Sequence, residues 1–221
     1  MIQQLCFDLG LIRQKKGCCL LLLAANIVYL IVGITVFHIS LDYGAVFTFL
    51  VTAINIDVIM LMINLHMSGN GIYVSNYTSC IYFPTKRAHF FNSKVVIEVG
   101  IVCYQCVCSS LLYVLGNSIY KKSFVLEYWL SYIVPIIIVA SVVSSTVMIS
   151  SFSGNAFRIG IIVASTILGG VIGVFTSLLR DEQSKMKGVS LKTALIILCI
   201  MLGIRVVSYV IVRFIVKQVN V

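Results

Sequence analysis

Three closely spaced cysteines, Cys103-x-x-Cys106-x-Cys108, are the residues of this chain whose type and spacing come nearest to metal chemistry. Zinc sites usually take four ligands, and no histidine lies near these cysteines in the sequence. On a helix Cys103 and Cys106 share a face, whereas Cys108 points well away from Cys103. Because buried cysteine usually acts as a small apolar residue, we predict packing roles and no metal in this chain.

The sequence contains no recognisable catalytic constellation. It has no G-x-S-x-G elbow, no H-E-x-x-H motif and no phosphate loop of the form G-x-x-x-x-G-K-[ST]. The three histidines, His38, His66 and His89, all lie near the ends of apolar segments. We therefore predict that the chain is not an enzyme and binds no ATP of its own.

Two opposite charges lie near the middle of apolar segments, Asp57 in one and Arg205 in another. A charge at the centre of a membrane span costs about 2.5–3.5 kcal/mol on insertion scales, so each side chain should face a partner or water. The two residues are expected at similar depths in the membrane, so they could form an Asp57–Arg205 ion pair. Other polar residues could join it in lining a polar path or a site for a cationic substrate, namely Asn55, Glu98 and Gln105. Both the pairing and the path remain open.

The composition indicates that lipid covers much of this protein. Of the 221 residues, 60% are hydrophobic and only 10% are charged, and the mean hydropathy is +1.08. Soluble domains carry roughly 25% charged residues. A water-facing surface cannot be built from so few charges.

Six apolar windows are long enough for helical spans, because a bilayer core about 30 Å thick needs about 20 residues. Backbone groups in hydrocarbon must bond internally, so each window should be helical. We expect one all-α membrane domain over residues 1–221. No small-residue cleavage site follows a short apolar region, so we expect the first span to be retained. The windows are Cys18–Phe37, Val46–Leu65, Val95–Leu115, Leu130–Ile149, Ile159–Leu179 and Leu191–Val212.

The first 17 residues have apolar residues at helical spacing and several cations. They predict an interfacial amphipathic helix, with a frayed basic flank as the alternative. Lys and Arg residues favour an inside N-terminus, nine against six, which puts both termini in the cytoplasm. We read the net charge of +9 as topology signals and lipid contacts, with no nucleic-acid partner. None of the eight cysteines falls in an expected outer loop, so we expect reduced thiols.

The longest loop, between the second and third windows, carries aromatic and basic residues around a proline. Proline is favoured in the first turn of a helix, so Pro84 could start a short helix reaching Phe91. Such a helix could dock onto a cytoplasmic partner, or it could be an interfacial turn whose cations meet lipid headgroups. The candidate contact residues are Phe83, Pro84, Thr85, Lys86, Arg87, His89, Phe90, Phe91 and Lys94.

The order Pro84-Thr-Lys-Arg87, then aromatics, then Ser93-Lys94 leading into a span resembles the loop of type-2 ATP-binding-cassette (ABC) permeases. In that family a Pro-x-x-Arg pattern after the second span marks the coupling helix. The resemblance extends loosely to the basic start, the six spans and the chain length. It implies a groove-bound coupling helix, two partner ATPase subunits that hold ATP and Mg²⁺, and a second permease chain in a homodimer or related pair.

The resemblance leaves the cargo open. This chain is short and lacks a large outer domain, and short permeases of this type resemble peptide exporters, including those for phenol-soluble modulins. We therefore expect small amphipathic peptides or toxins as cargo. Gly169 and Gly173, four residues apart, predict close helix packing in the fifth window. The rival interpretations are a channel-like or accessory membrane protein without an ATPase, and a membrane-integral enzyme.

Overall fold

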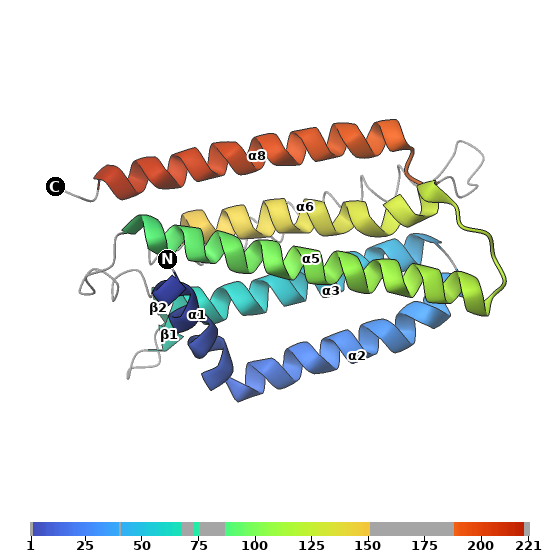
Figure 1. Ribbon diagram of the computed structural model, residues 1–221, viewed down its shortest axis with the longest axis horizontal. Coiled ribbons are helices and arrows are strands. Elements are labelled where there is room, and N and C mark those ends of the chain that lie inside the picture. The colour runs from blue at the N-terminus through green and yellow to red at the C-terminus, as the bar shows by residue number, and fades with distance from the viewer. Residues whose placement is uncertain (1, 40, 68–72, 76–86, 151–187, 219–221) are drawn as a thin grey trace.

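The computed structural model describes residues 2–39, 41–67, 73–75, 87–150 and 188–218. Within these residues the chain is almost entirely helical, with one short antiparallel hairpin (Figure 1). The elements are α1 (Ile2–Gln14), α2 (Lys16–Ile39), α3 (Leu41–Asn64), β1 (Leu65–Met67), β2 (Tyr73–Ser75), α5 (Arg87–Ile119), α6 (Leu126–Ser150) and α8 (Leu191–Gln218).

Five of the six predicted windows fall on helices α2, α3, α5, α6 and α8, and Leu65 alone leaves its window to begin β1. The window at 159–179 lies outside the described residues. By length and composition, two described helices can cross a membrane, Asn92–Ile119 and Leu191–Ile211. A third is added if α1 and Cys19–Thr35, bent by 80°, count as one broken span. A membrane protein is therefore consistent with these helices, whereas six complete spans are not established by them.

Apart from α1, the described helices run lengthwise in one elongated bundle, and α1 lies at the same end of it as the last turn of α8 (Figure 1). Hydrogen bonds fix the helix directions. Asn26 bonds to Asn55, so α2 and α3 are antiparallel, as their short connection requires. Val189 N donates to Glu127 O at the start of both α6 and α8, and Arg205 reaches Ser145 farther along, so these two helices are parallel.

The end of α5 and the start of α8 are fixed by turns with positive backbone φ angles. Lys121 has a φ of 51°, and the Lys122 N–H donates to the Asn117 carbonyl, which closes α5 in a Schellman turn. Gly188 has a φ of 39° against the backbone of Glu127, where a side chain would collide. Ser190 then caps α8, because its Oγ accepts the Thr193 N–H at 3.2 Å.

Close helix packing in the described bundle comes from a glycine that sequence reasoning passed over. A Cβ on Gly33 of α2 would lie 2.7 Å from a terminal methyl of Leu112 of α5, so a larger residue here would force the buried Leu112 side chain to shift. The pair predicted to play this role, Gly169 and Gly173, lies outside the described residues. Small residues act similarly in other membrane helices, where backbones can approach closely.

Large apolar side chains cover the outside of the bundle. On α8 alone, Leu195, Ile200, Val206 and Phe214 are each more than half exposed. A water-soluble monomer rarely exposes a continuous apolar surface of this extent. The polar side chains Thr48, Gln105 and Ser109 are instead fully buried between helices. This inside-out distribution fits a bundle whose outer face meets lipid.

Candidate functional site

A buried polar cluster fastens α1 to the beginning of the long helix α5. Asp8 of α1 forms an ion pair with Lys94, and the two side chains are 0% and 2% exposed. The second Asp8 oxygen accepts a 2.6 Å hydrogen bond from Ser93 Oγ, and Gln4 Nε2 donates to Asp8 Oδ1 at 3.1 Å. The carboxylate therefore has several donors, as a buried charge requires. We call these four residues the α1 anchor.

The α1 anchor corrects two expectations from the sequence. An interfacial amphipathic helix over the first 17 residues would turn its polar side chains toward water or headgroups, yet Asp8 of this helix faces the protein interior. Lys94 counted among the contacts to a cytoplasmic partner, yet it is 1% exposed and its charge is directed at Asp8. A side chain this deeply buried offers no charge to a partner surface.

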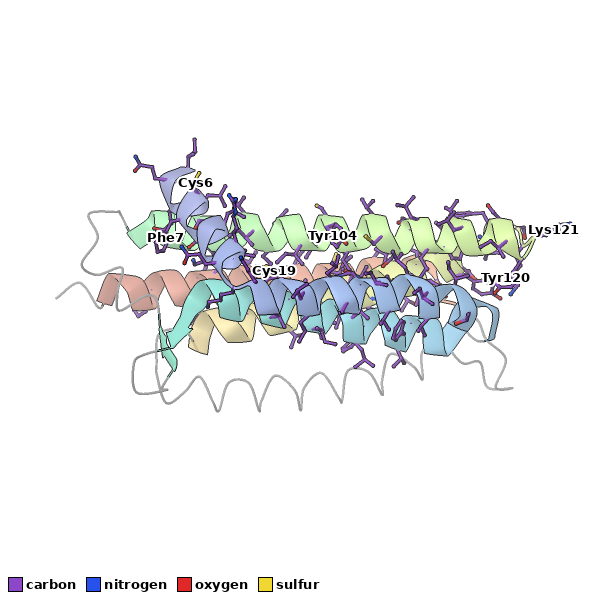
Figure 2. The ribbon with its side chains drawn as sticks, turned by 90° about the horizontal axis from the view of Figure 1, so that it is seen from below. Cys6, Phe7, Cys19, Tyr104, Tyr120 and Lys121 are labelled. Carbon is purple, nitrogen blue, oxygen red and sulfur yellow. The ribbon has the colours of Figure 1, made fainter. Side chains whose placement is uncertain are left out.

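The expected N-terminal helix is present as α1, and it meets α2 at a sharp corner. The axes of Ile2–Gln14 and Cys19–Thr35 differ by 80°. Lys15 N and Cys19 Sγ both donate to the Ile12 carbonyl, at 3.1 and 3.3 Å, so the last turn of α1 is tied to the start of α2. α1 therefore crosses from α2 toward α5 at one end of the bundle, where Cys6 and Phe7 lie. Tyr120 and Lys121 mark the other end (Figure 2).

The candidate coupling residues fall partly on α5. Phe83, Pro84, Thr85 and Lys86 lie outside the described residues. Residues 87–91 form the first turns of α5, and the side chains of Arg87, His89, Phe90 and Phe91 lie outside the described part. The expected helix was short and ended near Phe91, but no proline interrupts α5, and it continues to Ile119. This boundary is a correction, and the coupling role remains a prediction.

A second ion pair lies one turn farther along α5. Glu98 pairs with Arg205 of α8, and the two side chains are 5% and 23% exposed. Arg205 Nη1 also lies 3.5 Å from Ser145 Oγ of α6. The sequence offered Asp57 as the acid for Arg205, but the acid found in contact with it is Glu98. The side chain of Asp57 lies outside the described part of the chain. We call Glu98, Arg205 and Ser145 the α8 tie.

Three amide side chains meet between α2, α3 and α5. Asn55 Nδ2 donates to Asn26 Oδ1 at 3.2 Å and to Gln105 Oε1 at 3.0 Å. Asn26 Nδ2 donates to Asn55 Oδ1 at 3.0 Å and to the Leu22 carbonyl at 2.7 Å. Asn55 and Gln105 were candidates for a polar path or for pairing, and here they bond to each other. Such bonds hold membrane helices together.

A layer of hydroxyl groups lies next to the amides and joins the same three helices. Tyr29 Oη of α2 is 3.1 Å from Thr48 Oγ1 of α3 and 2.8 Å from Ser109 Oγ of α5. Thus α5 contributes one or more polar side chains to the α1 anchor, to the α8 tie, to the amides and to the hydroxyl layer, among them Lys94, Glu98, Gln105 and Ser109. Their spacings of four, seven and four residues keep them on one helix face.

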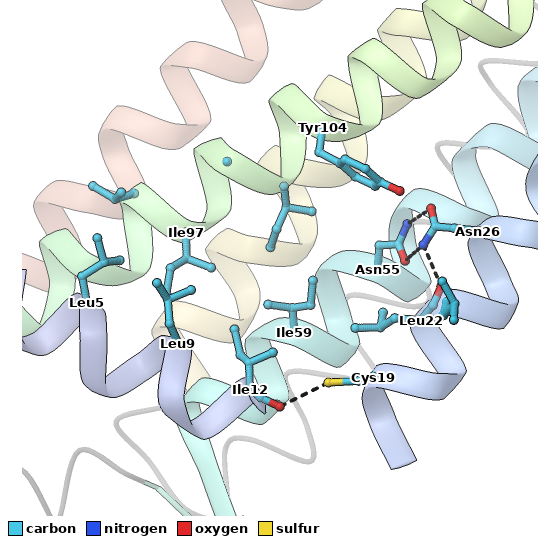
Figure 3. Close-up of a pocket in the computed structure, with 14 residues that line it drawn as sticks. Leu5, Leu9, Ile12, Cys19, Leu22, Asn26, Asn55, Ile59, Ile97 and Tyr104 are labelled. Carbon is cyan, nitrogen blue, oxygen red and sulfur yellow. Dashed lines mark hydrogen bonds between the residues drawn. The ribbon is translucent and has the colours of Figure 1, made fainter. Parts of the chain in front are cut away.

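An apolar groove of about 600 Å³ opens beside these layers, bounded by α1, α2, α3 and α5 (Figure 3). Leu5, Leu9 and Ile12 of α1 line one part of it, and the amides Asn26 and Asn55 lie at the part farthest from α1. A cavity of this size falls in the range typical of small-molecule sites. The groove can hold an apolar chain and offers it few polar contacts.

The cysteines bring no metal-ligand cluster together in the described part of the chain, where no group of three or more metal-ligating side chains occurs. The six cysteines whose side chains are described are free thiols, namely Cys6, Cys19, Cys103, Cys106, Cys108 and Cys199.

Sequence reasoning missed Gln4, Asp8 and Asn26 as members of polar clusters. The available signal was their polarity within otherwise apolar helix faces. In lipid, a buried polar residue marks a helix contact or a site.

No family model, no curated protein and no solved structure matches this chain.

Proposed function

We propose that this chain is the permease subunit of a type-2 ABC exporter in the plasma membrane, with six spans and both termini in the cytoplasm. The parallel arrangement of α6 and α8 supports the proposal of six spans, because two neighbouring parallel spans fit one further span between them in the sequence. The predicted window at 159–179 is long enough for that further span. The position of α1 and of the last turn of α8 at one end of the bundle also fits an even number of crossings (Figure 1).

One observation carries the proposal: Arg87, the last residue of the Pro84–Arg87 pattern, begins α5, which is the longest helix among the described residues. α5 has 33 residues from Arg87 to Ile119. At about 1.5 Å per residue it is about 50 Å long, enough to reach from the cytoplasm across the bilayer. A push on its first turn therefore moves the whole helix.

The α1 anchor and the α8 tie connect α5 to two other helices, so a movement of α5 would be passed on to both of them. Lys94 connects α5 to α1, and Glu98 connects it to α8. In the proposed mechanism two partner ATPases bind ATP and Mg²⁺, close together and displace the first turns of α5 in each permease chain. The chain itself performs no chemistry. It transmits movement and exposes a path alternately to the two sides of the membrane.

The proposed cargo is a small amphipathic peptide, passing between two permease chains. Within one chain the polar side chains Asn55, Gln105 and Ser109 already bond to neighbouring helices. A path between two chains would instead be lined by the apolar outer faces of the helices. An amphipathic peptide can pass along such faces with its own polar side hydrated.

Charge reversal at the head of α5 tests the proposal. A tagged chain purified from native membranes should retain an ABC ATPase, and Arg87→Glu should reduce the retained ATPase about tenfold or more, because like charges across an interface cost several kcal/mol. Lys121→Glu, at the opposite end of the bundle from Arg87, is the control and should retain the ATPase (Figure 2). If Arg87→Glu keeps both the ATPase and its stimulation, the coupling assignment is wrong.

A further inference from the structure

We propose that the groove beneath α1 is a binding site for one anionic phospholipid of the same leaflet, with an acyl chain in the groove and its phosphate at the α1–α2 corner. This inference goes beyond the exporter proposal and does not depend on a partner ATPase.

The shape of the groove favours an acyl chain over a folded peptide. Its volume is about 600 Å³. One turn of helix, about 10–12 Å wide and 5.4 Å long with its side chains, fills about 500 Å³, so only a single turn of a helical peptide would fit. An acyl chain is narrow and fits along such a groove. The walls facing it are Leu and Ile side chains from α1, α2, α3 and α5.

The direction of the groove matches one leaflet. Groove residues run from Cys19 at the corner to Asn26 farther along α2. These positions are seven residues apart, which is about 10 Å of helix. Half of the hydrocarbon core is about 15 Å thick, so the groove descends through much of a leaflet but does not cross the membrane.

The charge at the head of the groove selects the class of lipid. Ile12 and Cys19 both line the groove, and the corner between them carries Arg13, Lys15 and Lys16. Arg13 and Lys16 are exposed. Each cation near an anionic membrane surface contributes about 1 kcal/mol, which is about fivefold in affinity. A phosphate with no compensating headgroup cation, as in phosphatidylglycerol, fits this corner better than a zwitterionic lipid.

The bound lipid would have a structural consequence. The groove separates α1 and α2 from α5, and α1 reaches α5 through Asp8 and Lys94. An acyl chain in the groove fills the space beneath this bridge. It would keep the 80° corner open and hold α1 against the head of α5.

Two matched glycine substitutions test the site. A Cβ on Gly100 meets nothing within 4 Å, and Gly100 lines the groove, so Gly100→Leu fills it without a collision. Gly203 of α8 is equally open and lies away from the groove, so Gly203→Leu is the control. Native mass spectrometry of each purified chain with equal phosphatidylglycerol and phosphatidylcholine counts the retained lipids.

We expect one phosphatidylglycerol on the wild-type chain and on Gly203→Leu, and at least about fivefold less on Gly100→Leu. The variant that carries both Arg13→Gln and Lys16→Gln should lose about 25-fold of the preference for phosphatidylglycerol over phosphatidylcholine. Should Gly100→Leu fail to fold, Val96→Trp in the groove and Val99→Trp outside it make the same comparison. Equal retention by groove-filled and control variants would overturn the proposal. Displacement of the lipid by an amphipathic peptide alone would also overturn the proposal. An unchanged lipid preference in the variant that carries both Arg13→Gln and Lys16→Gln would overturn it as well.

Discussion

The two ion pairs on α5 lie one helical turn apart and differ in almost every respect. In the α1 anchor, α5 supplies the cation Lys94 to a fully buried acid that also accepts bonds from Ser93 and Gln4. In the α8 tie, α5 supplies the acid Glu98 to Arg205, which is 23% exposed and also lies 3.5 Å from the Ser145 hydroxyl. The first pair has little freedom to rearrange. The Glu98–Arg205 pair is less completely buried, because part of the Arg205 side chain is exposed.

This difference bears on how the bundle could move. A closed, multiply bonded pair fixes α1 and the head of α5 as one body. A partly exposed pair leaves the long arginine side chain more room to move than a closed pair does. We infer that α1 and the start of α5 move together, and that α8 is the element against which they shift.

The largest effect should come from breaking the α1 anchor on one side. Asp8→Ala leaves Lys94 buried without its acid, and loss of one partner of a buried pair costs about 3–5 kcal/mol. We expect a marked fall in the thermal unfolding temperature of the purified chain in detergent.

The control for this prediction is the neutral double variant, Asp8→Asn with Lys94→Met. Replacing both charges removes the unpaired ion, so much of the stability should return. A double variant as unstable as Asp8→Ala would show that the charge pair itself is not the source of the loss.

Breaking the α8 tie should cost less. Glu98→Gln removes the paired acid from Arg205, but Arg205 is less buried than Lys94. We expect a loss of about 2 kcal/mol, near the low end of the cost of a charge within a span. The same thermal measurement, compared directly with Asp8→Ala, checks the order. A larger loss for Glu98→Gln would reverse the proposed division between fixed and movable pairs.

The three bonded amides Asn26, Asn55 and Gln105 carry no charge, and breaking their bonds should cost less stability than breaking either ion pair. Asn55→Leu removes bonds to Asn26 and Gln105, and bonds between membrane helices average about 0.6 kcal/mol with a maximum near 1.7. We expect a loss of about 1 kcal/mol. Asn92→Leu, a partly buried amide on α5 outside this layer, is the comparison and should change stability less.

The smallest effect belongs to the weakest contact of the α8 tie. Ser145 Oγ lies 3.5 Å from Arg205 Nη1, which is long for a hydrogen bond. Ser145→Ala should therefore lower stability by about 0.5 kcal/mol or less. A loss as large as that of Glu98→Gln would mean that the hydroxyl, rather than the carboxylate, holds Arg205.

Hydropathy alone located the helices α2, α3, α5, α6 and α8, because lipid requires long apolar helices and few other sequences meet that condition. It could not find the α1 anchor. Asp8 and Lys94 are 86 positions apart, and nothing local to either residue identifies its partner. The helix α1 itself was predictable from its spacing of apolar residues, but the direction that its polar face takes was not.

Glu98 was already a candidate for pairing, but depth favoured Asp57 as the acid for Arg205. The third window was expected to begin at Val95, which places Glu98 only three residues into the span, whereas Asp57 and Arg205 both lie near mid-span. In the structure α5 begins at Arg87, so Glu98 lies eleven residues into the helix. Arg205 lies thirteen residues from the end of the antiparallel helix α8. Counting from the true helix ends places both residues at the same level.

The sidedness of the two ends of α5 tests the account most directly. In a functional version of the chain without native cysteines, single cysteines introduced as Arg87→Cys and Lys121→Cys would be exposed to a membrane-impermeant maleimide in intact cells. We predict that position 121 is labelled at once and that position 87 is labelled only after the membrane is permeabilised. Labelling of position 87 in intact cells would place the head of α5 outside, beyond the reach of any ATPase, and would contradict the proposed function.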